Sequence, residues 1–84
     1  MSKVTIYTNS WCPYCSAATE LLTKKGVAFT EYEITGKADL KDEMVKRSGR
    51  GTVPQIFVGE THVGGCDDLY AMEQRGGLDV LLAS

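Results

Sequence analysis

Trp11-Cys12-Pro13-Tyr14-Cys15 is the stretch that decides how this chain of 84 residues folds. Before it, residues 4–7 (Val-Thr-Ile-Tyr) are β-branched or aromatic and alternate, which predicts a strand. After it, residues 16–25 place Ala and Leu side chains at helical spacing without a helix breaker, which predicts a helix. The cysteines therefore lie where a strand leads into a helix, with Cys12 as the N-cap and Cys15 at the third helical position.

This position has a chemical consequence for Cys12. Pro13 suits the first helical position, because its fixed φ is helical and its missing N–H would have no partner there. The amides of Tyr14 and Cys15 have no acceptor within the helix, and the helix dipole adds partial positive charge at the same place. A sulfur at the N-cap is therefore favoured as the thiolate, the form that attacks disulfides. We predict that Cys12 is the nucleophile and that Cys15, which should be more covered, is the resolving thiol.

Three other interpretations of the two cysteines fit less well. A structural disulfide across so short a loop would remove little entropy from the unfolded chain. A zinc site needs further ligands at suitable spacing, and only Cys66 and His62 remain. Cysteines buried by chance would not explain the proline or the helix start. We therefore predict a redox-active pair, because a Cys-x-x-Cys motif near a βαβ pattern is typical of redox proteins.

The composition of the whole chain limits the classes of protein to consider. Its length predicts one domain over residues 1–84, and its net charge of −2 argues against nucleic-acid binding. No apolar run approaches the roughly 20 residues of a membrane span. Met1-Ser2-Lys3 leads directly into the first predicted strand, without the apolar core of a signal peptide. Because three cysteines without an export signal suggest a reducing compartment, we expect a cytoplasmic protein that does not bind membranes.

The rest of the chain predicts a β-α-β-α-β-β-α order. The second strand alternates imperfectly, which suits the edge of a sheet, and the first two strands should be parallel because a helix connects them. The hairpin loop is expected at Gly59-Glu60. The further elements are a strand at 27–34, a helix at 38–48, strands at 54–58 and 61–63, a helix at 67–74 that Gly76-Gly77 ends, and a short last helix at 78–82.

Three separated motifs together resemble a known family. They are Cys12-Pro13-Tyr14-Cys15, Thr52-Val53-Pro54 and Gly64-Gly65-Cys66-Asp67-Asp68. In this order and spacing the chain resembles the small dithiol glutaredoxins of the short bacterial type, over essentially its whole length. The resemblance implies an α/β thioredoxin-like fold, with a four-stranded mixed sheet flanked by helices.

The Gly64–Asp68 motif has a physical reason to bind a ligand. Two glycines permit close approach of the backbone, and the following helix N-terminus offers free amides to a carboxylate. Asp67 or Asp68 can meet an ammonium group. These features suit an amino-acid zwitterion such as the γ-glutamyl end of glutathione. Asp67 could instead simply cap the helix, but capping alone leaves the two glycines unexplained.

The resemblance also implies roles for residues near Cys12. It implies a cis Val53-Pro54 bond that faces the cysteines and leaves the backbone of Val53 to pair with a peptide. Cys66 is expected to be a small buried residue rather than a regulatory thiol. Trp11 should pack at the edge of the core rather than contact the substrate, and His62 should lie at the surface. The expected glutathione contacts are Tyr14, Thr52, Val53, Pro54, Gly65, Cys66, Asp67 and Asp68.

Asn9 departs from the pattern of the family. Glutaredoxins usually carry a lysine three residues before the first cysteine, where it favours the thiolate and attracts the glycine carboxylate of glutathione. Asn9 supplies no charge. Arg50 is a candidate to compensate, and otherwise the helix terminus has to stabilise the thiolate alone.

The resemblance implies a glutathione-dependent thiol–disulfide oxidoreductase. It would reduce protein–glutathione mixed disulfides and protein disulfides through Cys12 and Cys15. Glutathione would be the reducing cosubstrate; no nicotinamide, flavin or metal is expected, since no Gly-x-Gly-x-x-Gly motif is present. The partners would be glutathione and glutathionylated or disulfide-containing proteins, and we expect a monomer. The alternative is a dimeric glutaredoxin that binds a glutathione-ligated 2Fe–2S cluster; Pro13 argues against it, while Trp11 and the missing lysine leave it open.

Overall fold

The computed structural model describes residues 3–83; Met1 and Ser2, part of the argument about a leader, lie outside the described residues. The predicted order of elements is confirmed, and so is the short last helix at the end of the chain. No helix between residues 3 and 83 is both long and apolar enough to cross a membrane. The elements are β1 (Val4–Thr8), α1 (Pro13–Lys24), β2 (Phe29–Glu33), α2 (Ala38–Ser48), β3 (Gln55–Val58), β4 (Thr61–Gly64), α3 (Cys66–Gln74) and α4 (Gly77–Ala83).

The four strands form one mixed sheet in the order β2-β1-β3-β4. β1 is parallel to β2, with Val4 opposite Phe29, and antiparallel to β3, with Ile6 opposite Ile56. β4 is antiparallel to β3, and the register shifts next to Ile56. The predicted thioredoxin-like sheet is therefore confirmed, and β2 lies at its edge as its imperfect alternation indicates.

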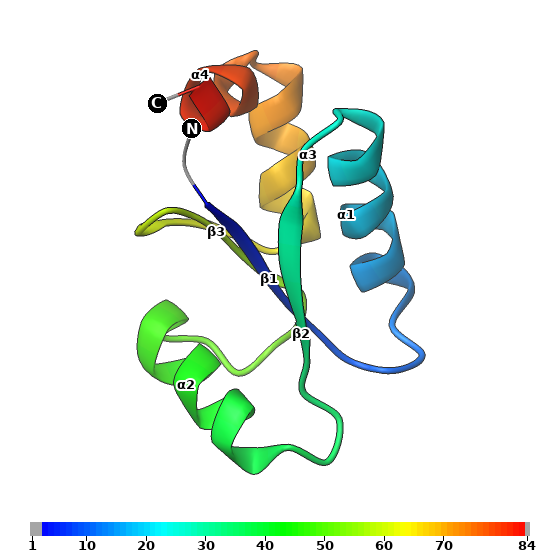
Figure 1. The fold of residues 1–84 in the computed structure, drawn as a ribbon, viewed down its shortest axis with the longest axis vertical. Helices are drawn as coiled ribbons and strands as arrows, with labels where there is room; N and C mark the ends of the chain where they lie inside the picture. Colours follow the sequence, from blue (N-terminus) through cyan, green and yellow to red (C-terminus); the bar gives the residue numbers. More distant parts are fainter. Residues whose placement is uncertain (1–2, 84) are drawn as a thin grey trace.

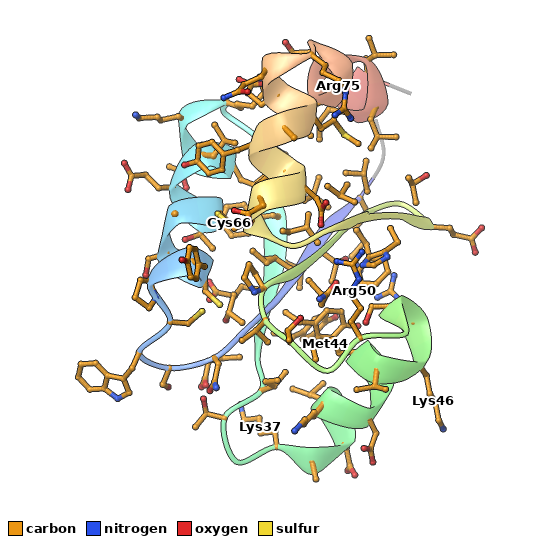
Figure 2. The ribbon with its side chains drawn as sticks, turned by 180° about the vertical axis from the view of Figure 1, so that it is seen from behind. Lys37, Met44, Lys46, Arg50, Cys66 and Arg75 are labelled. Carbon is orange, nitrogen blue, oxygen red and sulfur yellow. The ribbon has the colours of Figure 1, made fainter. Side chains whose placement is uncertain are left out.

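Helices cover both faces of this sheet. α1 and α3 pack beside each other with α4 at their far end, and α2 lies apart from them on the other side (Figure 1). The first face has an aliphatic core, and the second has an aromatic core, towards which Met44 points from α2 (Figure 2). The buried members of the first core are Val4, Ile6, Ala18, Leu21, Leu22, Ile56, Val58, Val63, Cys66, Leu69, Leu78 and Leu82; those of the second are Tyr7, Ile34, Met44 and Phe57.

An alternating strand usually buries only one of its two faces, but β1 buries both. All five of its residues are buried, because β1 is central and each face of the sheet is covered. Alternation here separates the two cores: Val4 and Ile6 belong to the aliphatic one and Tyr7 to the aromatic one. The Tyr7 hydroxyl donates a hydrogen bond to Glu43 Oε2 at 2.5 Å, which attaches α2 to the sheet.

Several predicted boundaries shift. β3 begins at Gln55, so Pro54 precedes the strand. α3 begins at Cys66 with Gly65 as its N-cap, so the alternative that Asp67 caps this helix is wrong. Gly76 follows α3 with φ +76°, but Gly77 is the first residue of α4.

Candidate functional site

Cys12 lies at the start of α1, as predicted. It is the N-cap, with extended backbone (φ −109°, ψ 103°), and Pro13 follows as the first helical residue. The amide of Cys15 donates a hydrogen bond to Cys12 Sγ over 3.2 Å. The half-buried sulfur thus accepts a hydrogen bond from an otherwise free helix amide at the positive end of the helix dipole.

Cys15 has the opposite environment. Its side chain is only 4% exposed. Burial, followed by a hydrogen bond with Cys12, raises the pKa of the Cys15 thiol to about 12. Cys15 is therefore a protonated thiol at neutral pH, which agrees with the prediction that it is the more covered cysteine.

A pocket of about 310 Å³ opens beside the start of α1 and brings two distant motifs together. It lies between the loop that follows α2 and the start of α3. All eight residues expected to contact glutathione line it, and Arg50 and Gln55 complete the lining. Its lining residues are Tyr14, Arg50, Thr52, Val53, Pro54, Gln55, Gly65, Cys66, Asp67 and Asp68.

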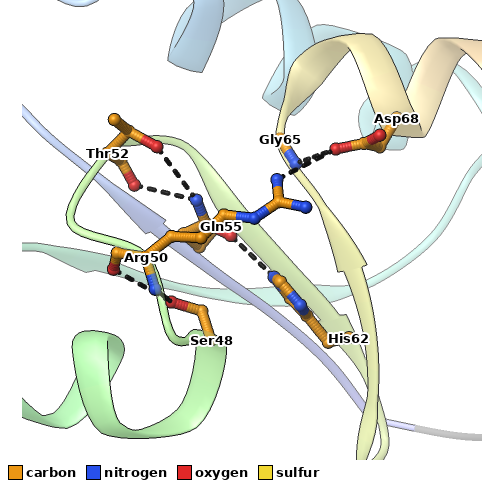
Figure 3. A network of polar contacts seen from close by, with 7 residues as sticks. All are labelled: Ser48, Arg50, Thr52, Gln55, His62, Gly65 and Asp68. Carbon is orange, nitrogen blue, oxygen red and sulfur yellow. Dashed lines mark hydrogen bonds and ion pairs between the residues drawn. The ribbon is translucent and has the colours of Figure 1, made fainter.

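One wall of this pocket is held by a buried glutamine that was not among the predicted site residues. The Val53-Pro54 bond is cis, as the family resemblance implies. Gln55, 1% exposed, donates from Nε2 to the carbonyl oxygen of Thr52 at 3.0 Å and to its hydroxyl at 3.3 Å (Figure 3). A glutamine directly after Pro54, in a strand that is otherwise apolar, was the signal that could have indicated this role.

His62 completes this arrangement. Because both Gln55 donors are on the Thr52 side, Gln55 Oε1 faces His62 and accepts from its Nε2 over 2.7 Å (Figure 3). The imidazole also stacks on Phe57, with ring centroids 4.9 Å apart. Burial lowers the pKa of His62. The expectation of a simple surface residue is therefore wrong: the side chain is half-buried and supports Gln55.

The opposite wall is built around Asp68. Its Oδ2 accepts a hydrogen bond from the Gly65 amide at 2.9 Å and lies 3.3 Å from Arg50 Nη1 (Figure 3). The Gly65 hydrogen bond, followed by the interactions with Arg50, lowers the pKa of Asp68. Ser48 Oγ accepts from the Arg50 amide at 3.0 Å and so supports the backbone from which the guanidinium extends. Arg50 therefore belongs to this pocket, where Asp68 offsets its charge.

The two glycines before α3 have different reasons to be present. Gly64 has φ +115°, and a Cβ there would collide with the Asp68 carboxylate. A Cβ on Gly65 would lie 3.5 Å from the Pro54 carbonyl oxygen, an ordinary contact. Gly64 is therefore required by the backbone, whereas Gly65 leaves the first amides of α3 without a competing side-chain cap.

A second hollow of about 270 Å³ lies on the other side of Val53. Asn9 lines it together with Lys41, and Val53 borders both hollows. Lys41 comes from α2 and was not among the predicted site residues, because it is far from Asn9 along the chain. It supplies a positive charge in the hollow that Asn9 borders.

Trp11 does not pack at the edge of the core, so that expectation is wrong. Its side chain is fully exposed, and its backbone has φ +59°. The preceding loop is held by polar contacts: the Ser10 amide donates to Asn9 Oδ1 and to Thr35 Oγ1, each over 2.9 Å. The neighbouring Tyr14 is 65% exposed.

Cys66 is buried, as expected, and lies where α3 begins (Figure 2). Burial raises the pKa of its thiol, and the negative charge of Asp67 acts in the same direction. Among residues 3–83, no three His, Cys, Asp or Glu side chains are grouped so that they could hold a metal ion.

Comparisons with known proteins point to one family. The family model described as Glutaredoxin matches residues 4–63. Glutaredoxin 3 of Escherichia coli strain K12 is 60% identical over 82 residues, covering 98% of this chain and 99% of the relative. The glutaredoxin of Pseudomonas aeruginosa is 55% identical over 84 residues, covering all of both chains.

Solved structures give the same result for the fold. The solution structure of glutaredoxin from Brucella melitensis is 55% identical with a TM-score of 0.85, covering 98% of this chain and 89% of that one. A buckwheat glutaredoxin–glutathione complex is 26% identical with a TM-score of 0.88, covering 98% of this chain and 77% of that one.

Proposed function

Because this chain belongs to the glutaredoxin family of thiol–disulfide oxidoreductases, we propose that it uses glutathione to reduce protein–glutathione mixed disulfides and protein disulfides. One observation carries this proposal: the residues expected from the family motifs line a single pocket next to Cys12. The buckwheat relative, whose structure is a complex with glutathione, supports the same ligand.

Glutathione would use both hollows. The carboxylate of its γ-glutamyl end would accept hydrogen bonds from the free amides at the start of α3, and Asp68 would meet the ammonium group. The central peptide would pair with the backbone of Val53, which Gln55 supports through Thr52. The glycine carboxylate would lie towards Lys41, which supplies the positive charge that Asn9 lacks.

The reaction would begin with the Cys12 thiolate. It attacks the glutathione sulfur of a mixed disulfide; the polypeptide sulfur leaves as a thiolate and takes a proton from water, and glutathione remains bonded to Cys12. A second glutathione, as its thiolate, then attacks the glutathione sulfur on Cys12. Glutathione disulfide is released and the Cys12 thiolate is restored.

Protein disulfides would require Cys15 as well. Cys12 first forms a mixed disulfide with the protein, and Cys15 then attacks Cys12, which produces a Cys12–Cys15 disulfide and releases the reduced protein. The raised pKa of Cys15 has two causes besides burial that come from Cys12: its hydrogen bond and its charge. The charge disappears once Cys12 is bonded to substrate, so Cys15 becomes easier to deprotonate after the first step.

The proposal is tested by comparing Cys12→Ser with Cys15→Ser. The substrate is a small glutathione mixed disulfide, and the readout is the steady-state rate with glutathione as the reductant. Cys12→Ser should be inactive, whereas Cys15→Ser should retain most of this activity and lose only the reduction of protein disulfides. Equal loss in both variants would contradict the assignment of roles. We further propose that the protein works as a monomer in the cytoplasm, with glutathione as its reducing cosubstrate.

A further inference from the structure

Trp11 is the one tryptophan of the chain, and the glutathione site does not use it. It directly precedes Cys12, its side chain is fully exposed, and it lines neither of the two hollows beside Val53. A tryptophan offers one of the largest apolar surfaces of any side chain, and exposing all of it to water forgoes the free energy of its burial. A partner that covers Trp11 would recover that free energy.

The backbone holds Trp11 in this position. Trp11 is the only non-glycine residue among residues 3–83 with positive φ. A non-glycine residue keeps such a conformation only where its surroundings impose it. Here the Ser10 amide is bound by Asn9 and Thr35, and Ser10 Oγ donates to Glu33 Oε1 over 3.2 Å. A side chain presented from a fixed loop loses little backbone freedom when a partner binds.

The geometry of the exchange reaction identifies that partner, and this step rests on the proposed function. With the glutathione half of a mixed disulfide in the pocket between the cis-proline loop and α3, the polypeptide half has to extend out of that pocket. Tyr14 lines the pocket, but Trp11 does not. Trp11 is thus the large apolar side chain next to Cys12 that remains free to meet the polypeptide.

We infer that Trp11 is a docking surface for the polypeptide half of the substrate, and that it favours mixed disulfides in which an apolar side chain adjoins the modified cysteine. Tryptophan suits this role because it offers a large contact area with only two side-chain torsions to fix. Tryptophans are also enriched among the residues that dominate binding energy at protein interfaces.

The test measures kcat/KM for three substrates, each with the unmodified protein and with Trp11→Ala. Two are glutathionylated peptides that differ only in having leucine or serine on either side of the modified cysteine, and the third is the mixed disulfide of glutathione with cysteamine. The unmodified protein should prefer the leucine peptide over the serine peptide by about tenfold in kcat/KM, the effect of one well-packed aromatic contact. Trp11→Ala should lose most of this preference, with little change towards the cysteamine substrate.

The single tryptophan provides a second readout. In Cys12→Ser, which cannot react, binding of the leucine peptide should shift the fluorescence emission of Trp11 to shorter wavelength, and the serine peptide should shift it less. In the kinetic comparison, Trp11→Phe should keep part of the preference for the leucine peptide that Trp11→Ala loses. Val80→Ala is the matched control: Val80 is 73% exposed on α4, at the end of the molecule away from the start of α1 (Figure 1), and its loss should leave the preference intact.

The results distinguish the docking surface from the glutathione site. Equal kcat/KM for the two peptides in the unmodified protein, or an equal loss on all three substrates in Trp11→Ala, would overturn the docking role. An absence of emission shift at saturating peptide would overturn it as well. Failure of the unmodified protein to reduce the cysteamine substrate would instead overturn the proposed function.

Discussion

Two helices, α1 and α3, begin at the same pocket, and each uses one half of the reciprocal arrangement called a capping box. At α1 the N-cap side chain accepts from the third helical amide: Cys12 Sγ accepts from Cys15 N–H at 3.2 Å. At α3 the third helical side chain accepts from the N-cap amide: Asp68 Oδ2 accepts from Gly65 N–H at 2.9 Å. The directions of the two hydrogen bonds are opposite.

This difference explains what each helix start can do. In α1 the amide of Cys15 is directed at a reactive atom of the protein itself, so the start of the helix supports a nucleophile. In α3 the N-cap is Gly65, which has no side chain, so its first amides remain available to a ligand. The same feature of helix termini thus supports chemistry in one place and binding in the other.

The largest expected effect separates Cys12, at the start of α1, from the two buried thiols, Cys15 and Cys66. Alkylation of the reduced protein with iodoacetamide at neutral pH should modify Cys12 more than about a hundredfold faster than Cys15, because only the thiolate reacts and a thiol with a pKa of about 12 is almost fully protonated. Cys66, at α3, should also react slowly, since its pKa is raised and its side chain is buried. Mass spectrometry of timed samples measures each rate. If Cys15 were modified as fast as Cys12, the expected difference in reactivity between the two thiols would be contradicted.

The next effect concerns the backbone that leads into α3. Gly64→Ala should reduce the free energy of unfolding by about 1–3 kcal/mol, because of its positive φ, and should raise the KM for glutathione by displacing the Asp68 carboxylate. Gly26→Ala is a matched control, since Gly26 has φ +71° but no atom within 4 Å of the added Cβ. Gly26→Ala should lower the free energy of unfolding without changing the KM for glutathione. A similar KM in both variants would show that Asp68 is not part of the binding site.

A smaller effect would make α3 resemble α1. Gly65→Ser gives α3 an N-cap hydroxyl that can accept from the Asp68 amide, which should raise the free energy of unfolding by a few tenths of a kcal/mol. The same hydroxyl competes with the ligand carboxylate, so the KM for glutathione should rise by about tenfold, the equivalent of one charge-assisted hydrogen bond.

Gly65→Ala is the control for Gly65→Ser, because it adds the Cβ, 3.5 Å from the Pro54 oxygen, without the hydroxyl. It should change the KM less than the serine does. If the two variants raise the KM for glutathione equally, the bulk of the added side chain rather than capping is responsible. That result would contradict the claim that the free amides of α3 bind the ligand.

The smallest expected effect is the pH dependence of the Asp68 cap. The pKa of Asp68 is lowered in the folded protein, mainly by the Gly65 amide, so its contribution to stability is present above the unfolded value of about 3.9 and is lost as the pH falls through the folded value. Asp68→Asn should therefore be less stable than the unmodified protein at pH 7, by under about 1 kcal/mol because the carboxylate is half exposed. Urea unfolding at several pH values should show the difference closing below about pH 4.

Arg50→Gln sharpens the same measurement. It removes the 3.3 Å ion pair but leaves the Gly65 amide donating to Asp68, so it should reproduce only the smaller part of the Asp68→Asn effect. A difference between Asp68→Asn and the unmodified protein that grows as the pH falls would have the wrong sign and would contradict the capping role.

The sequence predicted the start of α1 better than the start of α3. Cys12, Pro13 and Cys15 occupy the predicted helical positions, because a proline at the first position and apolar spacing after it are local signals. At α3 the sequence could not decide between two adjacent aspartates. Asp68, and not Asp67, provides the capping carboxylate, because the helix begins one residue earlier than the predicted boundary.

Residues whose roles depend on distant partners were predicted least well. Trp11 was expected to pack, yet the polar contacts of the preceding loop with Thr35 leave it exposed. Gln55 and His62 were not recognised as a pair, because they lie on neighbouring strands and meet only across the register shift of β3 and β4. Lys41 gained its significance only when α2 placed it beside Asn9.

The sequence alone determined the features that depend on a few consecutive residues: a sulfur at a helix start, glycines where the backbone needs them, and the order of strands and helices. Only the tertiary structure decided which groups meet across the sheet: the shared pocket, the Gln55 support of Thr52, the Arg50–Asp68 ion pair and the exposure of Trp11. The physical reason is the distance along the chain over which each interaction acts. Dihedral preferences and capping act within one helical turn, whereas burial and long-range hydrogen bonds depend on how separate elements pack.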